Sequence, residues 1–216
     1  MDEKNQKIRK IIGRVLIVAG SLLILFVITV NLIDLGKSTA AVEEFKERKV
    51  KVKVEKIDSE GNVIAPEDSE DILEESVSVE TGKVMYLLRI PKIKLEEAVR
   101  EGSTPNVLSS ALGHVENTAF PGQDGNCCIA GHRNYVFGKY FNRLDEIEEG
   151  DYIEIETPDE IYKYKVTGIE IVEPEDVSVL EYSEGKNMTL ITCTPFMIGT
   201  HRLIVHAEMV EGTSIL

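Results

Sequence analysis

The hydrophobic pattern of the chain begins with one long apolar stretch near the N-terminus. Residues 15–33, VLIVAGSLLILFVITVNLI, contain no charged side chain. In a helix with a rise of about 1.5 Å per residue, this stretch approaches the thickness of a bilayer hydrocarbon core, roughly 30 Å. The pattern therefore predicts a transmembrane helix over residues 15–33.

The residues before this stretch predict its orientation. Residues 1–14 are rich in basic side chains, namely Lys4, Lys7, Arg9, Lys10 and Arg14. By the positive-inside rule, residues 1–14 form a cytoplasmic basic segment of a single-pass plasma-membrane protein, and the residues after the helix are extracellular. A cleaved signal peptide is the alternative because residues 38–40 are small, but such a peptide has an apolar region of only about 7 to 15 residues.

Residues 34–82 carry the pattern of a linker. The run EDSEDILEESVSVE at 67–80 has few apolar positions and a strong excess of negative charge. Residues 49–57, KVKVKVEKI, alternate lysine with valine before a turn-like DSEGN, which leaves a local strand open. We expect an acidic extracellular linker that charge repulsion extends and that holds the next domain away from the membrane.

Residues 83–216 change to short β-rich runs separated by turn residues. The runs are residues 84–90, 126–132, 151–157, 162–172, 188–193 and 202–210. Such runs predict an all-β domain, either a closed barrel or a sandwich, and periodicity alone does not choose between the two. Two helices are also expected, at residues 104–114 with Thr104 as the cap, and at residues 139–151, where apolar residues recur near every third or fourth position.

Composition and charge narrow the functional classes. The 216 residues are 43% hydrophobic, which is enough for a packed core and excludes a disordered chain. The formal net charge of −14 argues against nucleic acid as a partner. Acidic residues are abundant but lack the spacing of an EF-hand loop, so no metal site is predicted and calcium dependence stays open.

Three cysteines and four histidines could carry chemistry. Cys127 and Cys128 are adjacent on a predicted strand, so their side chains point to opposite faces and cannot bind one metal together. We interpret both as buried small hydrophobes, with a disulfide to Cys193 as the alternative. His114, after the first predicted helix, and His206, within a predicted strand, are interpreted as structural.

Better candidates for catalytic residues lie at the ends of predicted strands. His132 follows the apolar run CCIA, and Gly131 before it allows a close approach of the backbone. Cys193 ends one run and Arg202 opens the next, and the eight residues between them suffice to join antiparallel neighbours. Strand alternation would send His201 away from Arg202, which we expect to be the inward residue.

A cysteine and an arginine that meet at the mouth of a hairpin have a chemical interpretation. A nearby cation stabilises a thiolate, and a guanidinium offers fixed donors to the oxyanion that forms when a thiolate attacks an amide. A histidine would complete the proton transfer. The structural alternative, a buried cysteine beside a surface arginine, stays open on this pair alone.

Three motifs in order along the chain resemble the sortase family. They are AGHRN at 130–134, TLITC at 189–193 and THR at 200–202. The resemblance covers roughly residues 83–210. It implies that residues 83–216 are a sortase catalytic domain, all-β with short helices and built as the eight-stranded sortase-type closed β-barrel.

The same resemblance implies roles for four residues. Cys193 would be the nucleophile and His132 the general acid and base. Arg202 would stabilise the oxyanion or the substrate, and Thr192 would be a substrate-binding residue near the scissile carbonyl. The implied chemistry needs no metal and no organic cofactor.

The implied reaction is transpeptidation. A sortase cleaves an LPxT-type sorting signal of a secreted protein between Thr and Gly or Ala, and transfers the acyl group to an amine of the cell-wall precursor. Two alternatives from other classes stay open. They are a surface cysteine peptidase that hydrolyses its acyl enzyme and a surface binding domain without activity.

The class of sortase is read from two further stretches. The segment GHVENTAFPGQDGNCCIAGHRN and the plain N-terminal anchor look most like class D, whereas CTPFMIGTHRLIV resembles the pilus-polymerising class C. Class C enzymes carry a lid with an Asp-Pro-aromatic motif. The nearest candidate here, IAPEDSED at 64–71, lacks both the preceding Asp and the aromatic residue, so we favour class D with an open groove.

Overall fold

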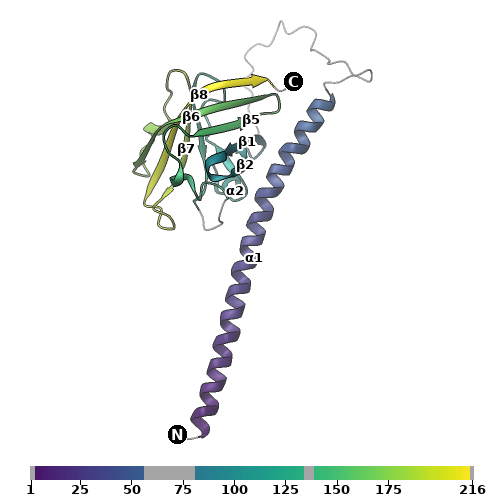
Figure 1. Cartoon of the computed structure of the whole chain (residues 1–216), viewed down its shortest axis with the longest axis vertical. Coiled ribbons are helices and arrows are strands. Elements are labelled where there is room, and N and C mark those ends of the chain that lie inside the picture. The colour runs from purple at the N-terminus through teal and green to yellow at the C-terminus, as the bar shows by residue number, and fades with distance from the viewer. Residues whose placement is uncertain (1–2, 56–80, 134–138, 215–216) are drawn as a thin grey trace. The chain divides into compact units, whose positions relative to one another are not determined.

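The computed structural model describes residues 3–55, 81–133 and 139–214 (Figure 1). The chain forms two compact units, Met1–Gly36 and Lys37–Leu216. The first unit is helical. The second contains the β-rich region together with the C-terminal part of the long helix.

The helix α1 spans Glu3–Glu55. Its part in the first unit includes the predicted span 15–33, where large apolar side chains such as Leu16, Ile17 and Phe26 are about two-thirds exposed. A helix that is apolar on all sides and unburied is suited to lipid rather than water. By length and composition α1 could cross a membrane, which suggests membrane anchoring.

The second part of α1 differs from the expected linker. Residues 37–55 are helical, so the expected extended linker and the local strand at residues 49–55 are wrong there. Ser38, Ala41, Val42 and Phe45 are buried within their own unit, at the spacing of one helix face. Burial of this stripe favours a helix. The sequence interpretation predicted a linker instead because it was based on the charged residues between the members of the stripe. Residues 56–80 of the expected linker, including residues 64–71, lie outside the described residues.

The strands of the second unit have the following bounds: β1 Val84–Ile90, β2 Leu95–Glu101, β3 Leu112–His114, β4 Gly125–Ala130, β5 Tyr152–Glu156, β6 Glu160–Val172, β7 Lys186–Thr194 and β8 His201–Ser214. The short helices are α2 Pro105–Leu108 and the 3-10 turns η1 Pro91–Ile93, η2 Leu144–Glu146 and η3 Ser178–Leu180. All six expected runs thus correspond to strands.

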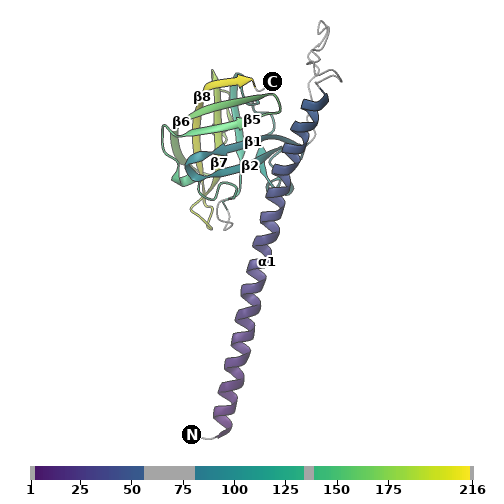
Figure 2. The ribbon, with the colours of Figure 1, turned by 45° about the vertical axis from the view of Figure 1, so that its right-hand side comes forward.

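The strands close into a barrel in the order β1-β2-β3-β4-β7-β8-β6-β5. Figure 2 shows β8, β6, β5, β1 and β2 following one another across one wall. Most neighbours are antiparallel, but β2 with β3 and β4 with β7 are parallel. The eight-stranded closed barrel implied by the resemblance is confirmed. Its parallel β4–β7 pair brings two strand ends with chemical candidates to the same edge.

The barrel interior is filled by alternate residues of the strands. On β7, Met188 and Leu190 point into the core, as do Leu203, Val205 and Ala207 on β8. Because the side-chain period of a strand is two, the residues between them face outward. The outward set of β7 includes Thr189, Ile191 and Cys193.

The two expected helices are shorter than predicted. Thr104 does cap α2, accepting a hydrogen bond from the Val107 backbone N–H at 3.5 Å, but α2 ends at Leu108 and the following residues pair as β3. Residues 139–151 contain only η2, because their apolar side chains are buried separately in the barrel core and Tyr140 has a left-handed backbone, φ 49°. Tertiary burial overrides the helical spacing there.

Candidate active site

Cys193 and Arg202 are directly opposite each other in the β7–β8 pair. Opposite residues of an antiparallel pair share one face, so both lie on the outer side of the barrel. Cys193 is partly exposed. The Arg202 Nη1 donates to the carbonyls of Gly199, at 3.3 Å, and His201, at 3.1 Å. The guanidinium is therefore held at the connection between the two strands.

His132 reaches the same place from β4. The β4–β7 pairing extends to Ala130 and Ile191, and the Gly131 backbone N–H then donates to the Ile191 carbonyl at 3.0 Å. His132 is exposed just beyond this pairing. The chain has to pass close here, since a Cβ on Gly131 would lie 2.5 Å from Leu112.

One pocket joins these residues. It has a volume of about 220 Å³, and its lining consists of His132, Arg133, Cys193, Met197, Ile198 and Gly199. We call it the Cys193 pocket. A thiol and an imidazole from distant parts of the sequence thus face one space. Arg202 is not part of the lining but holds the carbonyl of Gly199, which is.

Thr192 directly precedes Cys193 at the end of β7. Its side chain is 2% exposed and donates to the Gly131 carbonyl at 2.7 Å. It faces the opposite side of β7 from Cys193 and does not line the Cys193 pocket. The expected substrate contact of Thr192 therefore stays a prediction. The residue fastens the end of β7 to the segment that carries His132.

Arg133 is a residue of the pocket that the sequence interpretation missed. Its guanidinium donates to Thr194 Oγ1 at 3.1 Å, pairs with Asp145 at 2.7 Å and lies 5.9 Å from the centre of the Phe196 ring. These contacts join three segments around Cys193. The available signal was its place beside His132 in AGHRN, but a surface arginine would have the same sequence pattern.

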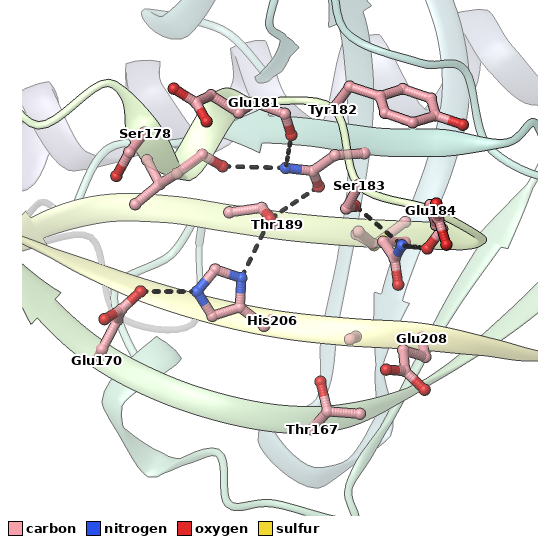
Figure 3. Close-up of a pocket in the computed structure, with 15 residues that line it drawn as sticks. Thr167, Glu170, Ser178, Glu181, Tyr182, Ser183, Glu184, Thr189, His206 and Glu208 are labelled. Atoms are coloured by element: carbon pink, nitrogen blue, oxygen red, sulfur yellow. Dashed lines mark hydrogen bonds and ion pairs between the residues drawn. The ribbon is translucent and has the colours of Figure 1, made fainter.

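A second pocket, of about 490 Å³, lies on the same outer face of β7 (Figure 3). Thr189 lines it, four residues before Cys193, which corresponds to about 13 Å along a strand. His206 bridges Thr189, at 3.3 Å, and Glu170, at 2.9 Å. Thr189 also donates to Asn126 at 2.8 Å. His206 is thus a hydrogen-bonded sheet residue, as expected from the sequence.

The thiols of the other two cysteines are buried. Cys127 and Cys128 are buried and neither forms a disulfide with Cys193. Burial raises the pKa of the Cys127 thiol and raises that of Cys128 to about 12. The interpretation of both as small hydrophobes is confirmed, and Cys193 is the accessible thiol.

Two further histidines have fixed partners. His114 is buried, with Nδ1 2.8 Å from Glu101 Oε2 and Nε2 3.0 Å from the Ala119 carbonyl, so its structural interpretation is confirmed. His201 pairs with Glu173 at 3.3 Å. Within the described ranges, no cluster of three or more His, Cys, Asp or Glu residues is suited to a metal ion.

Comparison with known proteins gives a consistent family. A family model described as the sortase domain matches residues 88–210. Sortase SrtE1 of Streptomyces coelicolor is 37% identical over 150 residues, which are 62% of this chain and 42% of the relative. Sortase D of Bacillus subtilis is 31% identical over 122 residues, which are 56% of this chain and 60% of the relative. The chain thus spans about half the length of these two curated relatives.

Solved structures agree. A Clostridium perfringens sortase D5 transpeptidase shares 33% identity with a TM-score of 0.59, over 81% of this chain and 96% of its own. Sortase E1 of Streptomyces coelicolor, solved with a tripeptide in the active site, shares 34% identity with a TM-score of 0.58, over 62% of this chain and 91% of its own. The family match includes His132, Cys193 and Arg202.

Proposed function

The chain belongs to the sortase family, and from this premise we propose that it is a membrane-anchored cysteine transpeptidase acting on LPxT-type sorting signals. The observation that carries the proposal is the Cys193 pocket. It combines an accessible thiol with His132, and Arg202 stands opposite the thiol on the neighbouring strand.

The first half of the proposed reaction forms a thioester. The Cys193 thiolate attacks the carbonyl carbon of the signal's Thr, and the oxyanion that develops is stabilised by Arg202. His132, as the acid, gives a proton to the leaving amine of Gly or Ala when the peptide bond breaks. Arg202 would have to exchange its present backbone acceptors for the substrate oxygen.

The second half transfers the acyl group. An amine of the cell-wall precursor attacks the thioester carbonyl, His132 takes its proton, and the Cys193 thiolate leaves as the new amide forms. The likeness to sortase E1, whose structure holds a tripeptide in the active site, supports a peptide as the acyl donor.

The membrane and class assignments extend this proposal. The apolar part of α1 would anchor the protein, with residues 1–14 in the cytoplasm and the barrel outside, where sorting signals emerge. Class D is favoured over class C because the sortase D5 structure is similar over 81% of this chain, against 62% for a sortase C-1 structure of Actinomyces oris. The reaction needs neither metal nor organic cofactor, and calcium dependence is left to titration with the cation.

A ligation assay tests the proposal. The full chain in detergent is mixed with an LPxT-type peptide, with and without an added amine, and products are identified by mass spectrometry. Peptide–amine product is expected from the wild type. Hydrolysis alone in the presence of amine would favour a cysteine peptidase, and no reaction with any LPxT variant would favour a binding domain.

A further inference from the structure

Glu97 of β2 is a buried carboxylate outside the Cys193 pocket. It is 0% exposed, and burial raises its pKa, an effect opposed by the hydrogen bond from Ser38 and the charge of Lys139. A buried carboxylate is costly unless it is hydrogen-bonded or paired. Its partners come from two segments that are far apart in the sequence.

The first segment is the helical stretch that begins the second unit. Ser38 Oγ, also 0% exposed, donates to Glu97 Oε2 at 2.7 Å. One turn further, Ala41, Val42 and Phe45 pack in a cluster with Val84, Leu87, Ala98 and Ala111. We call the packing of residues 38–49 on β1 and β2 the helix contact. It fixes Ser38 over Glu97.

Charged residues on the same stretch secure the helix contact. Arg48 Nη1 donates to the Val84 carbonyl at 2.5 Å. Lys46 pairs with Glu96 at 3.0 Å, but both side chains are largely exposed, so this pair contributes little. Lys49 pairs with Glu156 of β5. The stretch is therefore part of the folded catalytic unit rather than a tether.

The second segment lies directly behind His132. The Tyr140 backbone N–H donates to Glu97 Oε1 at 3.3 Å, and Lys139 Nζ lies 3.5 Å from the same oxygen. Tyr140 has φ 49°, an unfavourable conformation for a residue with a side chain, and persists only where surrounding contacts enforce it. The hydrogen bond to Glu97 is one such contact.

The neighbour of Tyr140 reaches the histidine itself. The Phe141 backbone N–H donates to the His132 carbonyl at 3.0 Å, and the Phe141 ring packs against Gly131 so closely that a Cβ there would lie 2.7 Å from it. A displacement of residues 139–141 would therefore move the backbone of His132.

We infer that Glu97 is a positioning residue for His132, and that the helix contact supports it through Ser38. Glu97 links the membrane-proximal helix to the backbone behind the acid–base residue without touching the substrate. The inference relies on the proposed function only for the role of His132 in turnover. The geometric part concerns the surroundings of the Cys193 thiol.

The test compares three variants of the full chain in detergent. Ser38→Ala removes one donor to Glu97, and Glu97→Gln keeps the shape of the side chain but removes its charge. Lys46→Ala is the matched control, because it removes an exposed ion pair of the same helix with Glu96, the neighbour of Glu97. Readouts are kcat and KM for ligation, and the pH dependence of Cys193 alkylation by iodoacetamide, followed by peptide mass mapping.

A displaced His132 should impair proton transfer more than peptide binding. We expect Ser38→Ala and Glu97→Gln to lower kcat by about tenfold or more with KM nearly unchanged, since misplacement by about 1 Å costs up to 10²-fold. The pH profile of Cys193 alkylation should also differ from that of the wild type, because the imidazole that faces the same pocket is displaced. Lys46→Ala should match the wild type in both measurements.

Two results would overturn the inference. One is a wild-type alkylation profile in a folded Ser38→Ala variant, and the other is an equal loss in Lys46→Ala. If Glu97→Gln fails to fold, Ser38→Ala alone decides. The alkylation profile needs no turnover, so it still decides the geometric question if the protein proves not to ligate peptides.

Discussion

The reactive groups of the Cys193 pocket are accessible, whereas the central polar groups of the helix contact are buried and hydrogen-bonded to each other. In the pocket, Cys193 and His132 face an open space, and Arg202 beside it donates to two backbone carbonyls. In the helix contact, Ser38 and Glu97 are fully buried and bonded to each other. The first arrangement leaves groups free for a reacting molecule, whereas the second uses them to fix the backbone.

The comparison separates activity from stability. Substitutions of Cys193 and His132 should reduce turnover and leave the fold intact, because these side chains are exposed or partly exposed and contribute little packing. Substitutions of the apolar residues of the helix contact should reduce stability first, whereas Ser38 acts on turnover through Glu97. The following four predictions test this division, from the largest expected effect to the smallest.

Cys193→Ala should abolish both cleavage and ligation, because the proposed thioester cannot form without the thiol. The fold should survive, since Cys193 is partly exposed at the end of a strand. Peptide turnover and circular dichroism check the two statements. Cys128→Ser is the matched control, a sealed thiol that should stay active if it folds. Turnover retained in Cys193→Ala would refute the proposed nucleophile.

Removal of the helix contact should have the next largest effect. A chain truncated to residues 50–216 loses the burial of Val42 and Phe45 that a chain of residues 37–216 keeps. At about 1.5–3 kcal/mol for each buried large apolar side chain, the free energy of unfolding should fall by about 3–6 kcal/mol. Urea denaturation of the two chains measures the difference. Equal midpoints would mean that the segment is a tether after all.

Sequence analysis predicted the Cys193 pocket better than the helix contact, for a physical reason. The β7–β8 hairpin is local, so strand alternation and a short connection bring Cys193 opposite Arg202. The position of His132 beside them depends on the parallel β4–β7 pair, which joins residues some 60 positions apart and which only the family resemblance implied.

The features that the sequence did not predict all depend on tertiary packing. The stripe of Ser38, Ala41, Val42 and Phe45 lies among lysines and glutamates, so its charge pattern resembles a linker until the cluster on β1 and β2 is known. Tyr140 interrupts the predicted helix because its ring is buried in the barrel core and its backbone N–H donates to Glu97. The hydrogen bond from Thr192 to the Gly131 carbonyl likewise depends on the pairing of β4 with β7.

Arg202→Lys should separate charge from geometry in the Cys193 pocket. Lysine keeps the positive charge but loses the planar set of donors that can hold an oxyanion. We expect kcat to fall by about 10²–10³-fold, or about 2.7–4 kcal/mol, by analogy with the loss of one oxyanion donor. The pH dependence of Cys193 alkylation should change little. A near-normal kcat would leave Arg202 as a charge that only favours the thiolate.

The smallest effect concerns the outer edge of the helix contact, where Glu156 lies between Lys49 and Arg89. Burial acts to raise the pKa of Glu156, but hydrogen bonds from Lys49 and Arg89 outweigh it, so the pKa lies below its ordinary value of 4.5. A lowered pKa stabilises the fold at pH values above the ordinary value. This contribution is lost as the pH falls from about 4.5 through the folded-state pKa.

Glu156→Gln should therefore flatten the acid side of the stability curve. At neutral pH the variant should lose about 1 kcal/mol, the upper end for partly exposed pairs, and below the folded-state pKa it should approach the wild type. Urea denaturation at a series of pH values measures both. Glu154→Gln on the same strand is the control, because Glu154 makes no ion pair with any described residue. The free energies of unfolding of the wild type and Glu156→Gln could instead differ by the same amount at all pH values. That result would show that the Glu156 side chain stabilises the helix contact by packing, as its apolar residues do, rather than by charge.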